Sequence, residues 1–560
     1  MSAIKSIANN YKLKEKITSA SNEETYRSVR RLGLKVDSRV RKVKTILRQQ
    51  IVNNNLHNNY DRYPKSGRLH WEIIEPVIPG QAYKYNYHLF TRQLTEFGVK
   101  WWLVKGLHHG RYVIGISESD RQATLVCLQN FALTHEKPLY AMDAGGRNPQ
   151  FVMTKVAAIR ELANTETLRC VAPRRSIVDG RRYGFAFGVD FEFWDLPNVA
   201  ADTSWITAPR ENQAARSIGS EDFELLNISQ EQGSALTPAV FSKSFLEDVD
   251  FEIDAVYTWV DDSDEKWQES RLRLLASISG IDFHPEATQA ARFHSRDELK
   301  YSLRSISYYA PWFRNIYIVT ADQVPSWLNT NNPRVKVVSH REIFNAEDLP
   351  TFNSNAIISR LHHIKELSEH FVYINDDVLF GKPVVKQDFF TSGGVALVSP
   401  SNNRRPFGLS DVSEGPHFNL TRNIRELLEN EFGKTISRAI KHTPHPMIKS
   451  LHFEMEEKFH DAYVRTWASR FRHHEDIVAD QLHHYYSQLV GRAVPGRLTY
   501  NYINIQDSNY IGVLQDTLAS KNRHVFCLND APDANLNPIP EDMLRKFFES
   551  YFPVKSEFEK

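Results

Sequence analysis

The stretch that most constrains the fold is IDAVYTWVDDSDEKW at 253–267, in which an apolar run ends abruptly in acidic residues. The apolar and aromatic residues of 253–260 are typical of a buried β-strand. Asp261, Asp262 and Asp264 follow directly. Ligands of open α/β sheets bind beyond the carboxyl ends of strands, and clustered carboxylates there need a compensating charge, most simply a divalent cation. The alternative is an acidic turn in which Asp264 caps a helix over 265–276.

A second stretch has the same design. Residues 371–374, FVYI, form a short β-prone run that ends in Asn375, Asp376 and Asp377. Two strands that each end in a carboxylate pair predict one metal–diphosphate site built from both, and hard oxygen ligands favour Mg²⁺ or Mn²⁺. The alternative is a simple turn, because all three residues favour turns.

Helical and strand patterns alternate from residue 251 onward. We expect strands at 316–319, 335–338 and 371–374, and helices at 299–306 and 354–368. This βαβ rhythm predicts a mostly parallel sheet with helices on both faces. The chain has no GxGxxG or GxxxxGK[ST] loop, so phosphates must be held by metal and basic side chains.

The first 250 residues have a different character. Residues 1–60 predict a basic amphipathic helical segment, which could lie on an anionic membrane surface, pack on a partner, or simply present a solvated charged face. Residues 61–200 predict a smaller α+β domain of unknown role. The alternating run from Phe185 to Phe193 predicts a strand with one buried face, which places Asp190 and Glu192 on the solvated face. Residues 201–250 are polar and are our candidate linker.

Bulk properties exclude several classes of protein. The formal net charge is +1, so no global field favours nucleic acid. Three cysteines form neither a disulfide framework nor a zinc motif and fit a reducing cytoplasm. No apolar run is long enough to span a bilayer, and the start lacks the apolar core of a secretion signal. We expect a cytoplasmic protein, free or held peripherally at the inner face of the membrane or on a capsule-export complex through its basic helix.

These stretches resemble the four motif regions of the Stealth family of sugar-1-phosphate transferases. That family includes bacterial capsule polymerases and the lysosomal-enzyme N-acetylglucosamine-1-phosphotransferase. The resemblance covers about 251–560 and leaves the amino-terminal half open. The matching stretches are IDAVYTWVDDSDEKW at 253–267; ARFHSRDELKYSLRSISYYAPWFRNIYIVT at 291–320, continuing through LPTFNSNAIISRLHHI at 349–364 to FVYINDDVLFGKP at 371–383; HTPHPMIKSLHFEMEEKF at 442–459 with SRFRHHEDI at 469–477; and VFCLND at 525–530.

We therefore predict an α/β protein. Its catalytic domain, at 251–560, should be a GT-A/Rossmann-like, mostly parallel sheet with helical insertions. A basic helical segment at 1–60, a smaller α+β domain at 61–200 and a linker at 201–250 should precede it.

The resemblance also implies a set of site residues. The metal or diphosphate ligands would be Asp376 and Asp377, with Asp264 and Asp530 close by; Asp262 is a weaker candidate because the family often has Gly there. Asp261 would face the substrate. Candidates to clamp phosphate oxygens are Arg292, Arg304 and Arg472. For Arg304 the alternative is a pair with Glu298 or Asp297 along its helix.

The remaining candidates concern the acceptor and the donor sugar. A histidine just before a helix can accept a proton near neutral pH, and the resemblance favours His442 as that base, with His445 second. Asp476 would orient the imidazole or bind the acceptor, or else form a salt bridge with Arg472. Arg422 and Asn423 would contact the donor sugar or its phosphate, or else form a helix-surface pair.

The resemblance implies transfer of a sugar 1-phosphate, N-acetylhexosamine 1-phosphate being our first expectation, from a UDP-sugar to a hydroxyl of an oligosaccharide or polysaccharide acceptor. The products would be phosphodiester-linked capsular polysaccharide and UMP, with Mg²⁺ or Mn²⁺ as cofactor. One alternative is a conventional metal-dependent glycosyltransferase, which would release UDP. The other is a non-catalytic scaffold of a capsule-assembly complex.

Overall fold

The computed structural model describes residues 69–560, except 108–109, 145–150, 155–161, 197–204, 231–232, 279–292, 294, 409–415 and 530–540. The basic segment predicted over 1–60 lies outside the described residues. Residues Ile511–Ser520, most of helix α14 (Tyr510–Ser520), fall in a compact unit separate from Tyr63–Tyr510 and Lys521–Lys560.

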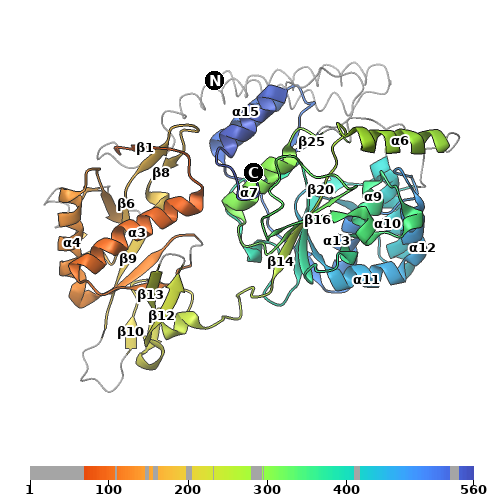
Figure 1. Ribbon diagram of the computed structural model, residues 1–560. Coiled ribbons are helices and arrows are strands. Elements are labelled where there is room, and N and C mark those ends of the chain that lie inside the picture. The colour runs from red at the N-terminus through yellow and green to blue at the C-terminus, as the bar shows by residue number, and fades with distance from the viewer. Residues whose placement is uncertain are drawn as a thin grey trace, which may run out of the picture. The chain divides into compact units, whose positions relative to one another are not determined.

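The first part of the described chain is the predicted α+β domain (Figure 1). Its mixed sheet has the strand order β2-β3-β9-β6-β4-β5. Helix α3 (Pro79–Phe97) ends at Gly98, which has a left-handed φ of 80°, and it packs with helix α4 (Arg121–Thr134). The strands are β2 (Trp102–Val104), β3 (Val113–Ser117), β4 (Tyr140–Asp143), β5 (Phe151–Val152), β6 (Thr167–Val171) and β9 (Val189–Trp194).

The predicted one-face-buried strand is only partly right. Phe185–Phe187 is a short 3₁₀ turn, and β9 is buried on both faces. Asp190 and Glu192 are therefore not solvated. Arg210 bonds to both, with Nη2 2.8 Å from Asp190 Oδ2 and Nε 2.6 Å from Glu192 Oε1, and Arg169 Nε lies 2.7 Å from Asp190 Oδ1. Buried carboxylates persist because they are paired.

The region predicted as a linker is instead folded. It forms two antiparallel hairpins, whose strands are β10 (Trp205–Thr207) with β11 (Ser217–Gly219), and β12 (Leu225–Gln230) with β13 (Gly233–Pro238). Ile206, Ile218 and Phe241 join Trp102 and Trp194 in one buried cluster. Short hairpins with alternately exposed side chains have a polar composition, which explains why the linker prediction was wrong.

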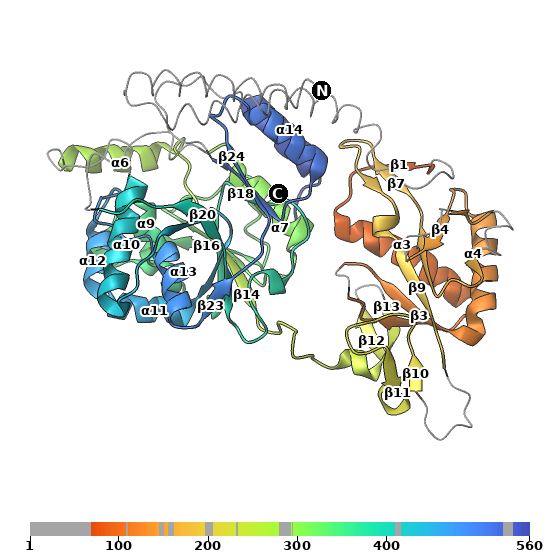
Figure 2. The ribbon, with the colours of Figure 1, turned by 180° about the vertical axis from the view of Figure 1, so that it is seen from behind.

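The second half contains the predicted parallel sheet, in the order β16-β15-β14-β17-β22. The first four strands are mutually parallel and β22 is antiparallel at one edge. Helices α9 to α13 gather beside it in both views (Figures 1 and 2). The prediction of an α/β domain with a mostly parallel sheet is confirmed. The strands are β14 (Ile253–Thr258), β15 (Ile316–Thr320), β16 (Val335–Ser339), β17 (His370–Asn375) and β22 (His445–Ile448).

Smaller elements complete this half. The helix expected at 354–368 is only α9 (Ser354–Ile358) and a 3₁₀ turn, η8 (Leu361–His363), before the chain extends into β17. A second sheet has the order β18-β25-β24. Its strands and the other helices are β18 (Val378–Phe380), β24 (Tyr500–Asn504), β25 (Val525–Asn529), α6 (Glu265–Ser277), α7 (Glu298–Tyr309), α10 (Pro416–Phe432), α11 (Lys449–Lys458), α12 (His460–Ala468), α13 (Ala479–Leu489) and α15 (Glu541–Tyr551).

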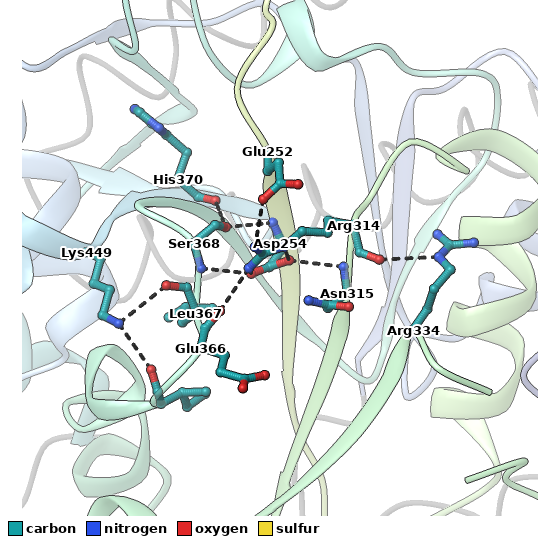
Figure 3. Close-up of polar contacts among 11 residues, drawn as sticks. Glu252, Asp254, Arg314, Asn315, Arg334, Glu366, Leu367, Ser368, His370 and Lys449 are labelled. Carbon is teal, nitrogen blue, oxygen red and sulfur yellow. Dashed lines mark hydrogen bonds and ion pairs between the residues drawn. The ribbon is translucent and has the colours of Figure 1, made fainter. Parts of the chain in front are cut away.

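A buried carboxylate ties together the amino end of the sheet. Figure 3 shows Asp254, near the start of β14, among its donors. Arg314 donates to it from Nε at 2.9 Å and Nη2 at 2.6 Å, and the backbone N–H groups of Asn315 and Ser368 donate at 3.0 and 2.8 Å. These bonds join the segments that lead into β14, β15 and β17 at the amino ends of the strands, and ligands of open α/β sheets bind at the opposite, carboxyl ends.

Candidate functional site

The strand register brings the second acidic cluster to the carboxyl ends of the parallel strands, which we call the carboxyl edge of the sheet. Thr258 of β14 is opposite Asn375 of β17, so both predicted acidic clusters follow strands that end at the same edge. Tyr373 is opposite His445 of antiparallel β22, so residue 442, which precedes β22, reaches that edge as well. The topology therefore gathers residues that are far apart in the sequence.

A hydrogen-bonded chain runs through this edge. His442 Nε2 lies 3.0 Å from Asp377 Oδ1, and Asn375 Nδ2 lies 3.1 Å from each ring nitrogen of His442. Tyr373 donates its hydroxyl to Asn375 Oδ1 at 2.5 Å, and Thr258 Oγ1 lies 3.0 Å from the Tyr373 hydroxyl. The His442 side chain is 30% exposed and that of Asp377 is 19% exposed, so a substrate can reach both groups.

The charges of this edge are unbalanced. Burial, then the neighbouring carboxylates of Asp377 and Glu298, raise the pKa of Asp376 well above its ordinary range. Burial also raises the pKa of Glu298, which accepts the backbone N–H of Arg296 at 2.7 Å. For His442, burial disfavours the charged form, but the carboxylates of Asp377, Asp480 and Asp376 together outweigh it and the pKa is raised. Carboxylates that repel one another in this way are suited to binding a cation.

Glu298 was not predicted as a site residue. In the sequence, Ser295 and Glu298 have the spacing of a capping box, but in the structure α7 begins at Glu298 with Asp297 as the N-cap residue. Only the charge of the HSRDEL stretch pointed to it.

Two carboxylates of the first acidic cluster accept hydrogen bonds from backbone groups two or three residues away. Asp264 Oδ1 accepts the backbone N–H of Trp267 at 3.0 Å, so the helix-cap alternative describes this carboxylate. Asp261 Oδ1 accepts the backbone N–H of Ser263 at 2.9 Å, and Gln323 bonds to both backbone groups of Asp261. The described residues contain one group of three or more His, Cys, Asp or Glu whose ligand atoms all lie within 4.8 Å of one another. That group does not include Asp264, Asp376 or Asp377. Asp530 lies outside the described residues, so the four-residue metal set stays a prediction.

Arg304 has a different place from the one predicted. Its Nε and Nη2 each lie 2.8 Å from a carboxylate oxygen of Glu559, and Nη1 donates to the carbonyl of Phe552 at 2.8 Å. The side chains of Arg304 and Glu559 are 7% and 2% exposed. A guanidinium committed to this buried pair fastens the end of the chain to α7 and does not support phosphate binding. Neither Glu298 nor Asp297 is the partner in this pair. Arg292 lies outside the described residues.

The remaining predicted residues surround the loop 472–476. Arg472 donates from Nε and Nη2 to Ser354 Oγ at 3.1 and 2.6 Å. Asp476 Oδ2 accepts from the amides of Asn353 and Asn355 at 2.8 and 3.1 Å, and burial raises its pKa to about 6. Asn423 of α10 donates to the carbonyl of Asp476 at 2.8 Å. This loop is thus bonded to the start of α9 and to α10.

Two further candidates are buried. Arg422 donates from Nη1 to Asn419 Oδ1 at 3.0 Å within α10. His445 is clamped at both ring nitrogens, with Nδ1 2.7 Å from Asp480 Oδ2 and Nε2 3.0 Å from the carbonyl of Lys441. His445 therefore bonds to the backbone of Lys441, the residue before His442, and its own side chain is only 5% exposed.

No helix in the part of the chain that the structure describes is both long and apolar enough to cross a membrane.

Comparisons with known proteins agree with the motifs. Models of Stealth protein conserved regions 1, 2, 3 and 4 match residues 251–278, 292–398, 441–488 and 516–560. An exopolysaccharide phosphotransferase of Streptomyces coelicolor is 34% identical over 87% of this chain and 86% of its own length. The exopolysaccharide phosphotransferase CpsY of Mycobacterium tuberculosis H37Rv is 33% identical over 86% of this chain and 90% of its own length.

Solved structures give a weaker likeness. The galactosyltransferase LgtC aligns with 54% of this chain and 98% of its own, at 10% identity and a TM-score of 0.29. The bifunctional glycosyltransferase WbbM aligns with 54% of this chain and 50% of its own, at 11% identity and a TM-score of 0.26. The fold assignment therefore rests on the strand pairings described above.

Proposed function

The chain belongs to the Stealth family, and from that premise we propose that it transfers a sugar 1-phosphate from a UDP-sugar to a hydroxyl of a growing polysaccharide. It is a sugar-phosphate transferase by its relationship to exopolysaccharide phosphotransferases. The single observation that carries the proposal is the contact of His442 Nε2 with Asp377 at 3.0 Å, at the sheet edge where Asp376 is also placed.

The reaction needs one bond to form and one to break. The acceptor oxygen attacks the phosphorus next to the donor sugar, and the bond from that phosphorus to the bridging oxygen breaks. UMP leaves with the bonding electrons, and the polymer gains a phosphodiester. Protein catalysis of phosphoryl transfer consists mostly of positioning and charge neutralisation, so both a proton acceptor and a cationic centre are needed at one edge.

His442 is suited to take the acceptor proton at Nε2. Asp377 accepts from that nitrogen in the structure, so Nε2 can take a proton only when the imidazole carries its own proton at Nδ1 and the incoming hydroxyl has replaced Asp377. Asn375, held by the hydroxyl of Tyr373, fixes the plane of the imidazole. Positioned base catalysis typically contributes about 10²–10⁴-fold.

The donor set fits a hard divalent cation, Mg²⁺ or Mn²⁺. Asp376 and Asp377 offer carboxylate oxygens, and a bound cation would stabilise the charged form of Asp376, whose pKa is raised by burial and by its acidic neighbours. When bound, the ion would neutralise the diphosphate charge that repels an incoming oxygen. Asp261, Asp264 and Asp530 remain further candidates for this role.

The loop 472–476 is suited to bind one of the two substrates. Arg472 has a guanidinium of intermediate burial that donates to Ser354, and guanidinium forks match phosphate oxygens. Asp476 and Asn423 hold this loop in place. We propose that Arg472 contacts the diphosphate, and that Asp476 contributes mainly by fixing the loop.

The test is a panel of UDP-sugars, starting with UDP-N-acetylhexosamines, supplied with Mg²⁺ and an oligosaccharide primer. Phosphodiester resonances in the ³¹P NMR spectrum of the product would support the proposal and identify the donor. Glycan extension without phosphorus in the product would favour glycosyl transfer. Absence of turnover with every donor would favour a scaffold.

A further inference from the structure

A second cluster of ligand-type side chains lies away from the catalytic edge. His362 and His363 belong to η8, between β16 and β17, and Glu456 belongs to α11, which begins where β22 ends beside the amino end of β17. His362 Nε2 and His363 Nε2 lie 2.6 and 2.8 Å from the same Glu456 oxygen, Oε2.

The convergence of two adjacent histidines is unusual. A 3₁₀ turn has three residues per turn, so neighbouring side chains normally point about 120° apart. Here both imidazoles face one oxygen, and their ring centroids lie 4.3 Å apart. Phe453 of α11 packs edge-on against both rings, at 4.6 Å from His362 and 5.2 Å from His363, and holds them in this orientation.

The two elements that carry the cluster are tied together independently of it. Lys449, the first residue of α11, donates to the carbonyls of Ile364 and Leu367 at 3.1 and 3.3 Å, directly after η8. Figure 3 shows the contact with Leu367. The backbone frame is therefore fixed before any ligand binds.

We propose that His362, His363 and Glu456 bind a divalent transition-metal ion, with Zn²⁺ as the first candidate. Two imidazole nitrogens and one carboxylate are a recognised zinc ligand set, with the fourth position left to water. The ligand atoms all lie within 4.8 Å of one another. Tetrahedral coordination requires the nitrogen and oxygen atoms to separate by roughly half to three-quarters of an ångström.

The cluster is open to solvent on one side. His363 and Glu456 side chains are 26% and 17% exposed, which gives an ion and its water a route in, whereas His362 is 0% exposed.

Two features lower the affinity that we expect for the metal ion. Arg360 Nη1 lies 3.7 Å from Glu456 Oε1 and competes for the carboxylate charge. The buried Nδ1 of His362 has no hydrogen-bond partner, so coordination through Nε2 leaves its N–H without an acceptor. We therefore expect a site weaker than closed structural zinc sites with four protein ligands, and one that Zn²⁺ occupies but Mg²⁺ does not, because imidazole ligands favour the softer ion.

The test uses the full-length protein, stripped with a chelator, saturated with Mg²⁺ and dialysed against Zn²⁺. The number of Zn²⁺ ions per chain, measured by mass spectrometry, should be lower by one than in the wild type in Glu456→Gln. It should be lower by one as well in His363→Ala, which changes the more exposed of the two histidines. Glu457→Gln, an exposed neighbour on the same helix, should keep the wild-type content. Substitution with Co²⁺ should give tetrahedral absorption bands in the wild type that Glu456→Gln lacks.

The outcomes separate this proposal from the catalytic one. Asp376→Asn should retain the Zn²⁺, whatever happens to its activity. Equal Zn²⁺ content in the wild type, Glu456→Gln and His363→Ala, with each variant folded by circular dichroism, would overturn the proposal and leave these residues as a hydrogen-bonded cluster only.

Discussion

Nε2 of His442 lies 3.0 Å from a carboxylate oxygen of Asp377, although the two residues are 65 positions apart in the chain. The contact exists because antiparallel β22 returns the chain to the carboxyl edge at which β17 ends. The candidate proton acceptor and a candidate metal ligand are therefore hydrogen-bonded to each other. Loss of His442 should remove the proton acceptor, and loss of Asp377 should remove a candidate metal ligand.

His442→Ala should lower kcat by about 10²–10⁴-fold while the dissociation constant of the UDP-sugar donor stays close to wild type, because the variant lacks only the proton acceptor. Steady-state kinetics with a donor titration by calorimetry would measure both. His460→Ala, an exposed histidine on α12, is the matched control. Wild-type kcat in His442→Ala would remove this residue from the mechanism.

Asp376→Asn should abolish turnover and weaken the stabilisation of the protein by Mg²⁺. The carboxylates of Asp377 and Glu298 help to raise the pKa of Asp376, so removing its charge in a cation-free buffer should raise the free energy of unfolding by roughly 0.5–2 kcal/mol. Thermal melts with and without Mg²⁺ would measure both effects. Glu347→Gln, an exposed carboxylate, should respond as wild type does. An unchanged Mg²⁺ response in Asp376→Asn would argue against a cation at this edge.

Arg304→Gln should destabilise the fold by about 3–5 kcal/mol, because it leaves Glu559 buried without its partner. The KM for the donor should stay unchanged in the protein that remains folded, because Arg304 is not a phosphate ligand. Urea unfolding and steady-state kinetics give the two values. The exposed pair Arg341–Asp322, 77% and 50% exposed, offers the control Arg341→Gln, expected to cost about 0–1 kcal/mol. A raised KM with normal stability in Arg304→Gln would restore the phosphate-clamp hypothesis.

Asp476 should make stability depend on acid pH. Burial raises its pKa from the ordinary 3.8 to about 6, so the folded protein holds this proton more tightly than the unfolded chain does. The contribution is therefore most favourable below about pH 4 and is lost as the pH rises through about 6, by at most about 3 kcal/mol. Asp476→Asn should flatten this part of the curve of unfolding free energy against pH. An identical curve in Asp476→Asn would contradict the assignment.

The parallel sheet could be predicted because its strands are continuous apolar runs that alternate with helical patterns, and the second acidic cluster followed from its position after such a run. The partners could not be predicted in the same way. Glu559 lies 255 positions from Arg304, and no local pattern marks that pair. Asp264 fits both a helix cap and a metal ligand by sequence, and only the structure shows that its Oδ1 accepts the backbone N–H of Trp267 and so caps α6.

The errors in the amino-terminal half have one physical cause. Composition reports the average polarity of a segment and not its pairing. The short hairpins of β10 to β13 expose alternate residues and so resemble a linker, whereas Asp190 and Glu192 were expected in solvent because their arginine partners come from other strands and loops. Family motifs do not cover this half, so no resemblance corrected the prediction.

The most direct test of phosphoryl transfer follows the phosphorus atom. UDP-N-acetylglucosamine, or the donor that the panel selects, is labelled with ³²P in the phosphate next to the sugar and incubated with the wild-type protein, Mg²⁺ and primer. The label should enter the polymer while unlabelled UMP is released in equal amount. Label retained in UDP, with an extended but unlabelled glycan, would contradict the account.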